Sequence, residues 1–238
     1  MTTYEDSGVN VEKGDACSRL AYEAAKATFA GREGMIGAPA ILEGGFSGAI
    51  DMGDFFLVQN DDGVGSKMMV AEALGIFDTV GRDLVAMVAD DAICVGAEVI
   101  SLTNTVDIES VDEAVIGPMM EGLREACLEQ KIVVPGGEIA ELGGQVNGVI
   151  WNATAVGIVE KDKFIDGSKI AAGDVILGLR SAGFRSNGFS LIRKILTDKF
   201  GEDWASAEFA DGQTWGEVVL EPSLIYHRGL LNLLGAYG

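Results

Sequence analysis

The chain has 238 residues, of which 48% are apolar and 23% are charged, and its formal net charge is −20. This length and apolar content allow one large domain or two modest ones, and they argue against wholesale disorder. The negative charge argues against nucleic acid as the main partner, because phosphate backbones are bound through Lys and Arg. An acidic protein that binds phosphorylated ligands needs a counter-charge, which points to bound Mg²⁺.

The cysteines and the histidine exclude several kinds of site. Cys17, Cys94 and Cys127 are odd in number and far apart. We therefore expect small core residues in a reducing compartment, with no disulfide framework and no zinc site. The single histidine, His227, rules out a multi-histidine metal site. The N-terminus lacks a signal-peptide pattern and no run of about 18 apolar residues occurs, so we expect a soluble, cytoplasmic protein.

The first 54 residues predict a helix and then a glycine-rich stretch. Helical spacing over residues 15–30 predicts a helix capped by Asp15 and ended by Gly31. In residues 31–54, glycines such as Gly45 and Gly48 would let the backbone approach a ligand closely. A mobile surface loop would have the same composition.

Residues 55–67, FFLVQNDDGVGSK, join an apolar strand to the residue types of metal and anion sites. The strand over 55–58 is followed by two acids and two glycines, Asp61, Asp62, Gly63 and Gly65. A helix is predicted to start at Ser66, and it carries Lys67 in its first turn. Acids at a strand end can hold a metal ion, and a helix N-terminus with a lysine can hold an anion. An ordinary turn between a strand and a helix explains these residues about equally well.

Residues 79–95 predict a buried helix, closed by Gly96, that is apolar on nearly every face. It nevertheless carries Asp83, Asp90 and Asp91. Burying an unpaired carboxylate costs several kcal/mol, so we expect these acids to meet a cation or a hydrogen-bond network. At a rise of 1.5 Å per residue, Asp83 and Asp91 lie roughly 12 Å apart along the helix axis and cannot hold the same ion.

Three further strands are predicted in the middle of the chain, over residues 99–106, 132–134 and 148–159. The second of these ends in the motif PGGE at 135–138, which would place Glu138 on a flexible glycine turn.

A helix is predicted between the first and second of these strands. Ser110 and Glu113 form a capping box at its start, and it reaches about residue 131. Pro118 lies inside it and is expected to kink or split it.

Beyond residue 160 the pattern predicts a polar hinge over 160–173 and a new strand over 174–179. The loop 180–188 then leads into a helix over residues 189–200. This loop and helix N-terminus form a second candidate cradle for an anion.

Seven short motifs follow one another along the chain. They are Y-x-D-S-G-V at 4–9, D-G-V-G-S-K at 62–67, D-L-V-A-M with a following acid at 83–91, G-A-E at 96–98, G-G-E at 136–138, D-G-S-K at 166–169 and S-N-G-F-S-L at 186–191. In kind and order they are similar to those of the phosphoribosylformylglycinamidine cyclo-ligase, or aminoimidazole ribonucleotide synthetase, family. The resemblance covers residues 4 to about 226.

The resemblance implies an α+β fold of two domains. Residues 1–166 would form an N-terminal domain for ATP binding and dimerisation, and residues 167–238 the first part of a C-terminal domain. In the family the N-terminal domains of two copies pair into a β-barrel, so a homodimer is implied.

The activity implied by the resemblance is that of an ATP-dependent cyclo-ligase of purine biosynthesis, with ATP and Mg²⁺ as cofactors. ATP activates the formyl amide oxygen of formylglycinamidine ribonucleotide, the small-molecule substrate. An amidine nitrogen then displaces phosphate and closes the imidazole ring of aminoimidazole ribonucleotide.

The same resemblance implies a set of site residues. The expected catalytic residues are Asp62, Lys67, Asp91 and Glu138, of which Asp62 and Asp91 would bind the metal ion. The expected nucleotide-binding residues also include Gly45, Gly48, Gly63, Gly65, Asp83 and Gly137. Substrate binding is expected from Arg185, Ser186, Asn187 and Gly188. The contact of Arg185 with the substrate phosphate is expected from its place before a helix N-terminus and from the paired hydrogen bonds that a guanidinium forms with phosphate, and not from the resemblance.

The chain departs from the family pattern at several points. Arg185 stands where histidine is usual, Ile139 where threonine is usual, and Gly143 where proline is common. An arginine stays charged at any working pH, so no general base is expected at position 185. A later H-x-T-G-G-G motif of the family is missing, and we therefore expect a truncated C-terminal domain.

Two alternative interpretations stay open. Selenophosphate synthetase, hydrogenase maturation factor and thiamine-phosphate kinase belong to the same superfamily. The first needs a reactive cysteine or selenocysteine near its N-terminus and the second a C-terminal cysteine, and this chain has neither. The kinase lacks the Y-x-D-S-G-V opening that this chain has. The chain could also be a truncated, catalytically silent nucleotide-binding or dimerisation module. The missing motif favours this module, and the retained Asp62, Lys67, Asp91 and Glu138 argue against it.

Overall fold

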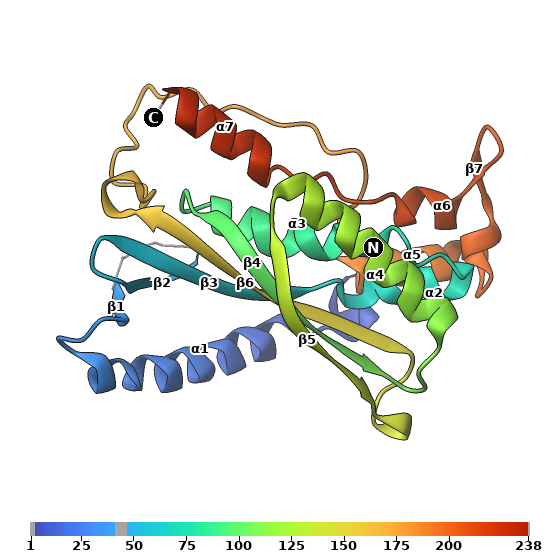
Figure 1. The fold of residues 1–238 in the computed structure, drawn as a ribbon. Helices are drawn as coiled ribbons and strands as arrows, with labels where there is room; N and C mark the ends of the chain where they lie inside the picture. Colours follow the sequence, from blue (N-terminus) through green and yellow to red (C-terminus); the bar gives the residue numbers. More distant parts are fainter. Residues whose placement is uncertain (1–2, 41–46, 238) are drawn as a thin grey trace.

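The computed structural model describes residues 3–40 and 47–237. Its centre is a six-stranded sheet with the strand order β1-β2-β3-β6-β4-β5 (Figure 1). Neighbouring strands are antiparallel, except that β4 and β5 are parallel. The strands are β1 (Ala38–Ala40), β2 (Gly48–Asp51), β3 (Phe55–Gly63), β4 (Glu98–Ile108), β5 (Val133–Glu141) and β6 (Val149–Glu160).

Two helices, α3 (Val80–Ile93) and α4 (Glu113–Gln130), cover one face of the sheet (Figure 1). Along β6 every second residue from Val149 to Val159 is buried, as expected for a strand with one covered face. The core lies between this face and α3, most of whose residues are buried.

The opposite face of the sheet is open to solvent. Ile100 of β4 and Ile150 of β6 are 41% and 45% exposed on it. Thr103, Thr105 and Asn152 between them are also exposed. Apolar side chains on a largely uncovered sheet face are a feature of surfaces that pair with another molecule.

The remaining helices precede the sheet, connect two of its strands or follow it in the sequence. They are α1 (Val11–Ala27), α2 (Met68–Leu74), α5 (Phe189–Phe200), α6 (Trp215–Leu220) and α7 (His227–Tyr237), and a short hairpin joins β7 (Glu208–Ala210) to β8 (Gln213–Thr214). Helix α6 packs against α2, and α7 packs against α3. Helices α6 and α7 are therefore tied to α2 and α3.

Most of the predicted elements form. The strands predicted from residues 55, 99 and 148 correspond to β3, β4 and β6. The helix predicted over 79–95 is α3 and is buried as expected, and α5 spans residues 189–200. Gly75 ends α2 in the left-handed conformation, with φ of 66°.

Three strand predictions need correction. β3 continues to Gly63, so Asp61 and Asp62 lie within the strand and not in a turn beyond it. β5 runs straight through the PGGE motif as an exposed edge strand, where a proline costs no ladder hydrogen bond on the open side. Residues 174–179 form no strand. Ile176 is 95% exposed, and no neighbouring strand pairs with this segment among the described residues.

Three helix predictions also need correction. The first helix begins at Val11, because the Asn10 side chain caps it by accepting from Lys13 N at 2.8 Å, and Asp15 lies inside it. Asp112, and not a Ser110–Glu113 box, caps α4. Pro118 does not split α4, which is continuous to Gln130.

The cysteines are all free, as expected, but only Cys127 is a core residue; Cys17 and Cys94 are exposed. In the described part of the chain no helix has the length and apolar character needed to cross a membrane.

The packing of α3 against α4 depends on two glycines that allow close backbone contact. A Cβ atom added to Gly122 would lie 2.0 Å from the carbonyl oxygen of Asp78, and one added to Gly81 would lie 2.2 Å from the amide nitrogen of Leu123. We predict that Gly122→Ala lowers the free energy of unfolding by about 1–3 kcal/mol, because the backbones must separate.

The matched control is Gly229→Ala in α7, where an added Cβ meets nothing within 4 Å. This change should raise stability by up to about 1 kcal/mol through helix propensity alone. Urea unfolding followed by circular dichroism measures both variants, and equal stability of the two would contradict the close-packing argument.

Candidate functional site

Asp62 of β3 faces helix α3. Side chains alternate along a strand, so Val58, Asn60 and Asp62 share one face, and Val58 is fully buried. The Asn60 side chain donates to the carbonyl oxygen of Val88 on α3 at 2.8 Å, which identifies this face as the covered one. Asp61 points to the open face, where the Thr154 hydroxyl donates to it. The two adjacent acids are therefore separated by the sheet.

Asp91, near the C-terminal end of α3, lies within electrostatic range of Asp62. Burial, followed by the nearby carboxylates of Asp62 and Asp90, raises the pKa of Asp91 to about 6, against the opposing charge of Arg185. The Ser47 hydroxyl donates to the carbonyl oxygen of Asp91 at 3.1 Å and holds the start of β2 against this end of α3. Asp62 and Asp91 thus form a half-buried carboxylate pair, and neither acid has an ion-pair partner within residues 3–40 and 47–237.

This pair fits a magnesium ion better than a metal held by protein alone. Among residues 3–40 and 47–237, no group of three or more His, Cys, Asp or Glu side chains is placed to hold a metal. Mg²⁺ usually takes only one or two carboxylates and completes its shell with water and substrate phosphates. Asp62 and Asp91 supply that number of oxygen ligands.

Lys67 is committed to an internal ion pair. Its ammonium group is fully buried, lies 2.8 Å from Asp83 Oδ2 and donates to the carbonyl oxygen of Glu221 at 2.7 Å. Burial lowers the pKa of Lys67, and the charge of Asp83 opposes that shift. Asp83 also accepts from the backbone N–H and the hydroxyl of Ser223, at 2.9 and 2.6 Å. These bonds fix the turn Gly65–Lys67 to α3 and to the segment that leads into α7.

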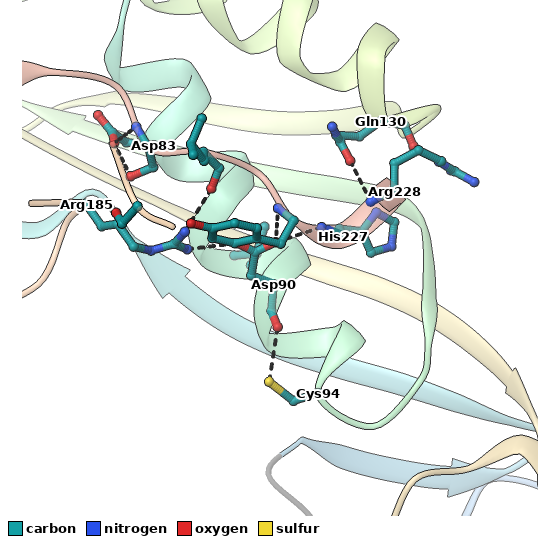
Figure 2. A network of polar contacts seen from close by, with 12 residues as sticks. Asp83, Asp90, Cys94, Gln130, Arg185, His227 and Arg228 are labelled. Carbon is teal, nitrogen blue, oxygen red and sulfur yellow. Dashed lines mark hydrogen bonds and ion pairs between the residues drawn. The ribbon is translucent and has the colours of Figure 1, made fainter. Parts of the chain in front are cut away.

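Asp90 lies on the same helix as Asp83 but binds different groups, as Figure 2 shows. Its Oδ1 accepts from the backbone N–H groups of Tyr226 and His227 at 2.9 and 3.0 Å, so the carboxylate caps the N-terminus of α7. Its Oδ2 lies 2.8 Å from Nη2 of Arg185. Burial raises the pKa of Asp90, and the ion pair with Arg185 lowers it.

The Arg185 guanidinium is held on more than one side. Nη1 donates to the carbonyl oxygen of Leu224 at 2.8 Å, and the guanidinium lies 5.4 Å from the centre of the Tyr226 ring. The backbone of Arg185 has φ of 58°, which is uncommon for a residue with a side chain. Such strain persists only where the surroundings hold it in place, and the bonds to Asp90 and Leu224 do so here.

Two of the motif segments meet beside Lys67. The hydroxyls of Ser66 and Ser190 lie 3.4 Å apart, and a Cβ added to Gly65 would lie 3.9 Å from the carbonyl oxygen of Ser186. Ser186 is only 7% exposed, and its hydroxyl has no hydrogen-bond partner among the described residues. The start of α5, the Ser186–Gly188 loop and the Gly65–Lys67 turn therefore border one region that has polar groups to offer.

Glu138 lies apart from these groups. It pairs with Thr105 in β4, and Thr105 pairs with Asn152 in β6, which pairs with Gly63 in β3. This row faces the open side of the sheet, and β5 is three strand spacings, about 14 Å, from β3. Within one chain the fold does not bring Glu138 to Asp62.

Two of the predicted nucleotide-binding glycines, Gly63 and Gly137, allow close packing within the sheet. A Cβ added to Gly63 would lie 2.1 Å from the Asn152 side chain, and one added to Gly137 would lie 2.8 Å from the carbonyl oxygen of Asn104. Gly65 has φ of 64°, which its turn requires. Gly48 is exposed at the start of β2, and Gly45 lies outside the described residues.

Sequence reasoning missed several residues that complete these networks. Ser47, Glu221 and Ser223 are small or surface-type residues with no motif of their own, and they act here through a hydroxyl or a backbone carbonyl. The one available signal was Asp83 itself, because a buried acid predicts partners without saying which they are.

The raised pKa of Asp91 predicts a pH-dependent stability of the metal-free protein. Between about pH 4 and 6 the folded chain binds more protons at Asp91 than the unfolded chain, so its contribution to stability falls as the pH rises through this window. Asp91→Asn removes the charge and should raise the melting temperature at pH 7.5 by a few degrees. Below pH 4 the variant and the wild type should melt together.

Asp61→Asn, on the opposite face, is the control and should show no such pH-dependent gain. Thermal unfolding from pH 3.5 to 8 measures all three proteins. A lower melting temperature of Asp91→Asn at pH 7.5 would contradict the electrostatic account.

Comparison with known proteins finds a matching family model and curated relatives. Residues 45–159 match the family model described as AIR synthase related protein, N-terminal domain. The curated relatives include phosphoribosylformylglycinamidine cyclo-ligase of Pyrococcus furiosus, which is 43% identical over 98% of this chain and 69% of the relative. The protein of the same name from Thermococcus kodakarensis is 41% identical over the same shares of the two chains.

The similar solved structures are more distant. Thiamine monophosphate kinase from Aquifex aeolicus has a TM-score of 0.37 and 19% identity, covering 46% of this chain and 35% of that one. T. maritima PurL complexed with FGAR has a TM-score of 0.42 and 15% identity, covering 52% of this chain and 19% of that one.

Proposed function

The chain belongs to the phosphoribosylformylglycinamidine cyclo-ligase family, and from that premise we propose how its residues divide the work of the reaction. The protein is an ATP-dependent ligase of purine biosynthesis that closes the ring of formylglycinamidine ribonucleotide to give aminoimidazole ribonucleotide. A catalytically silent module is not favoured, because the identity to named cyclo-ligases extends over 98% of the chain.

The observation that carries the site proposal is the pairing of Asp62 on β3 with Asp91 on α3. The reaction gathers the charges of ATP and of a phosphorylated substrate on a chain with 37 acidic and 17 basic residues. Lys67 is bound to Asp83, so its charge is already used within the fold. We assign the metal-binding role to Asp62 and Asp91, whose carboxylates would hold Mg²⁺ beside the nucleotide phosphates. When bound, Mg²⁺ supplies positive charge that offsets the phosphates during phosphoryl transfer.

The chain's own groups then orient the substrate. The formyl amide oxygen attacks the terminal phosphorus of ATP, ADP leaves, and an amidine nitrogen next displaces the phosphate from the activated carbon. The backbone N–H groups at the start of α5, with Ser186, Asn187 and Gly188, are suited to hold the substrate close to this exchange. Arg185 supports them through its bonds to Asp90 and Leu224, and this is the role we assign to it in place of direct contact with phosphate.

Lys67, Asp83 and Glu138 receive supporting roles in the proposal. Lys67 and Asp83 fix the Gly65–Lys67 turn, so that its N–H groups keep one position relative to Asp62. Glu138 lies on the open face of the sheet, so we propose that it contributes to a site through the second copy that covers that face.

The metal proposal predicts which acids nucleotide binding needs. Calorimetry of ATP with the wild type should show binding that depends on Mg²⁺. Asp62→Asn and Asp91→Asn should each weaken Mg²⁺–ATP binding by about tenfold or more, because each removes one charged ligand. Asp61→Asn is the matched control, since its side chain lies on the other face.

Two outcomes would count against the assignment. Equal affinity with and without Mg²⁺ would remove the metal from the site. Equal loss in all three variants would show a general charge effect and not a specific carboxylate pair.

We further propose a homodimer that forms across the open sheet face. Exposed Ile100 and Ile150 would be buried by a second copy, and a two-fold dimer is the commonest way to cover such a surface. We predict that light scattering gives twice the chain mass at micromolar concentration and that Ile150→Lys gives the mass of one chain. Ile170→Lys, at a 77% exposed position outside the sheet, should leave the dimer intact. A wild-type chain that is monomeric at this concentration would rule the proposal out.

A further inference from the structure

A polar pocket of about 260 Å³ lies between the N-terminal turn Glu5–Ser7 and helix α5. Its lining residues are Asp6, Ser7, Ser190, Arg193, Lys194 and Thr197. The four residues from α5 have the spacing i, i+3, i+4 and i+7, which places them on one face of the helix. The N-terminal turn belongs to the Y-x-D-S-G-V motif, to which the catalytic proposal gives no role.

The cations of this pocket are not fully used within the chain. Among the residues that the structure describes, Arg193 forms no ion pair, and its guanidinium donates at 2.8 Å to the sulfur of Met69, a weak acceptor. Lys194 pairs with Asp198 one turn further along α5, which engages one of its three donors. A guanidinium with free donors matches the oxygens of a phosphate group, with which it forms paired hydrogen bonds.

The acid in the pocket has a different use. The Asp6 carboxylate accepts from the backbone N–H and the hydroxyl of Thr3, both at 2.8 Å, and these bonds lower its pKa. An ionised carboxylate held in this way accepts hydrogen bonds from sugar hydroxyls, as acidic residues do in ribose recognition. Ser7 lies beside it, with its hydroxyl donating to the carbonyl oxygen of Tyr4 at 2.6 Å. Cations next to a fixed acceptor suit a ligand that carries both a phosphate and hydroxyl groups.

The pocket adjoins the candidate site. The Ser190 hydroxyl, on its wall, lies 3.4 Å from the hydroxyl of Ser66 in the turn that Lys67 fixes. A Cβ added to Gly188 would lie 3.5 Å from the Tyr4 hydroxyl, so the N-terminal motif packs directly on the Ser186–Gly188 loop. A ligand held in the pocket by its phosphate would extend toward the turn and the loop.

We propose that this pocket binds the ribose 5-phosphate end of the substrate, with Arg193 and Lys194 on the phosphate and Asp6 on the ribose hydroxyls. The inference rests on the proposed function for the identity of the ligand, and on the pocket alone for its chemical class. It gives the Y-x-D-S-G-V motif a role in substrate recognition that is separate from the metal site.

The test is calorimetry of the full chain with ribose 5-phosphate, with inorganic phosphate and with Mg²⁺–ATP. Arg193→Ala and Lys194→Ala should each weaken ribose 5-phosphate binding by about tenfold, and Asp6→Asn should weaken ribose 5-phosphate more than inorganic phosphate. Lys199→Ala, on the same helix but outside the pocket, should bind as the wild type does. Circular dichroism and urea unfolding confirm that each variant is folded.

Several results would overturn the inference. Wild-type affinity of Arg193→Ala for ribose 5-phosphate would remove the phosphate contact. Weakened Mg²⁺–ATP binding in the same variant would assign the pocket to the nucleotide and not to the substrate.

Steady-state kinetics separates this inference from the proposed function. A rise of about tenfold in the KM for formylglycinamidine ribonucleotide, with kcat nearly kept, supports both. Arginine-dependent binding of ribose 5-phosphate by a chain without turnover would leave the pocket in place and contradict the cyclo-ligase reaction. Normal turnover with an unchanged KM in both Arg193→Ala and Lys194→Ala would contradict substrate binding in the pocket and leave the reaction in place.

Discussion

The structure depends on how helix α3 satisfies three carboxylates while its other faces are buried in the core. A buried carboxylate is tolerated only when it is paired or hydrogen-bonded, so each acid determines what packs beside the helix. Asp83 takes Lys67 and Ser223, and Asp90 takes Arg185 and the start of α7. Asp83 holds the Gly65–Lys67 turn and a segment 140 residues further along the chain against α3. Asp90 holds Arg185 and the start of α7, which lie more than 90 residues further along. The third acid, Asp91, has no ion-pair partner among the residues that the structure describes, and it lies within electrostatic range of Asp62.

This division has a consequence for catalysis. Lys67 and Arg185 form ion pairs with Asp83 and Asp90, so neither forms an ion pair with Asp62 or Asp91. Under the proposed function, the positive charge at this acid pair comes with the ligand, as a divalent ion. The same bonds that withdraw the cations also hold the Gly65–Lys67 turn and the strained loop at Arg185, which border the region proposed for the substrate. Stability and site geometry therefore come from one network (Figure 2).

Much of the fold, and less of the site, could be predicted from the sequence. Apolar alternation identified β4 and β6, and the unbroken apolar character of α3 predicted its burial. The buried acids predicted partners, but Ser223 and Glu221 lie about 140 residues away and carry no pattern. The PGGE motif predicts a turn, because glycine and proline weaken strands, yet pairing with β4 outweighs that local preference. Residues 174–179 show the converse, since strand propensity alone forms no strand without a neighbour to pair with.

The most direct test of the central claim is spectroscopic. Mn²⁺ replaces Mg²⁺ in the complex with ATP, the aspartates carry ¹³C in their carboxyl groups, and electron–nuclear double resonance detects carboxylates bound to the ion. The account predicts a ¹³C coupling from two directly bound carboxylates in the wild type. One of the two should be lost in Asp62→Asn and one in Asp91→Asn, while Asp61→Asn keeps both. A spectrum without ¹³C coupling, or one that neither variant changes, would contradict the assignment of this acid pair as the metal site.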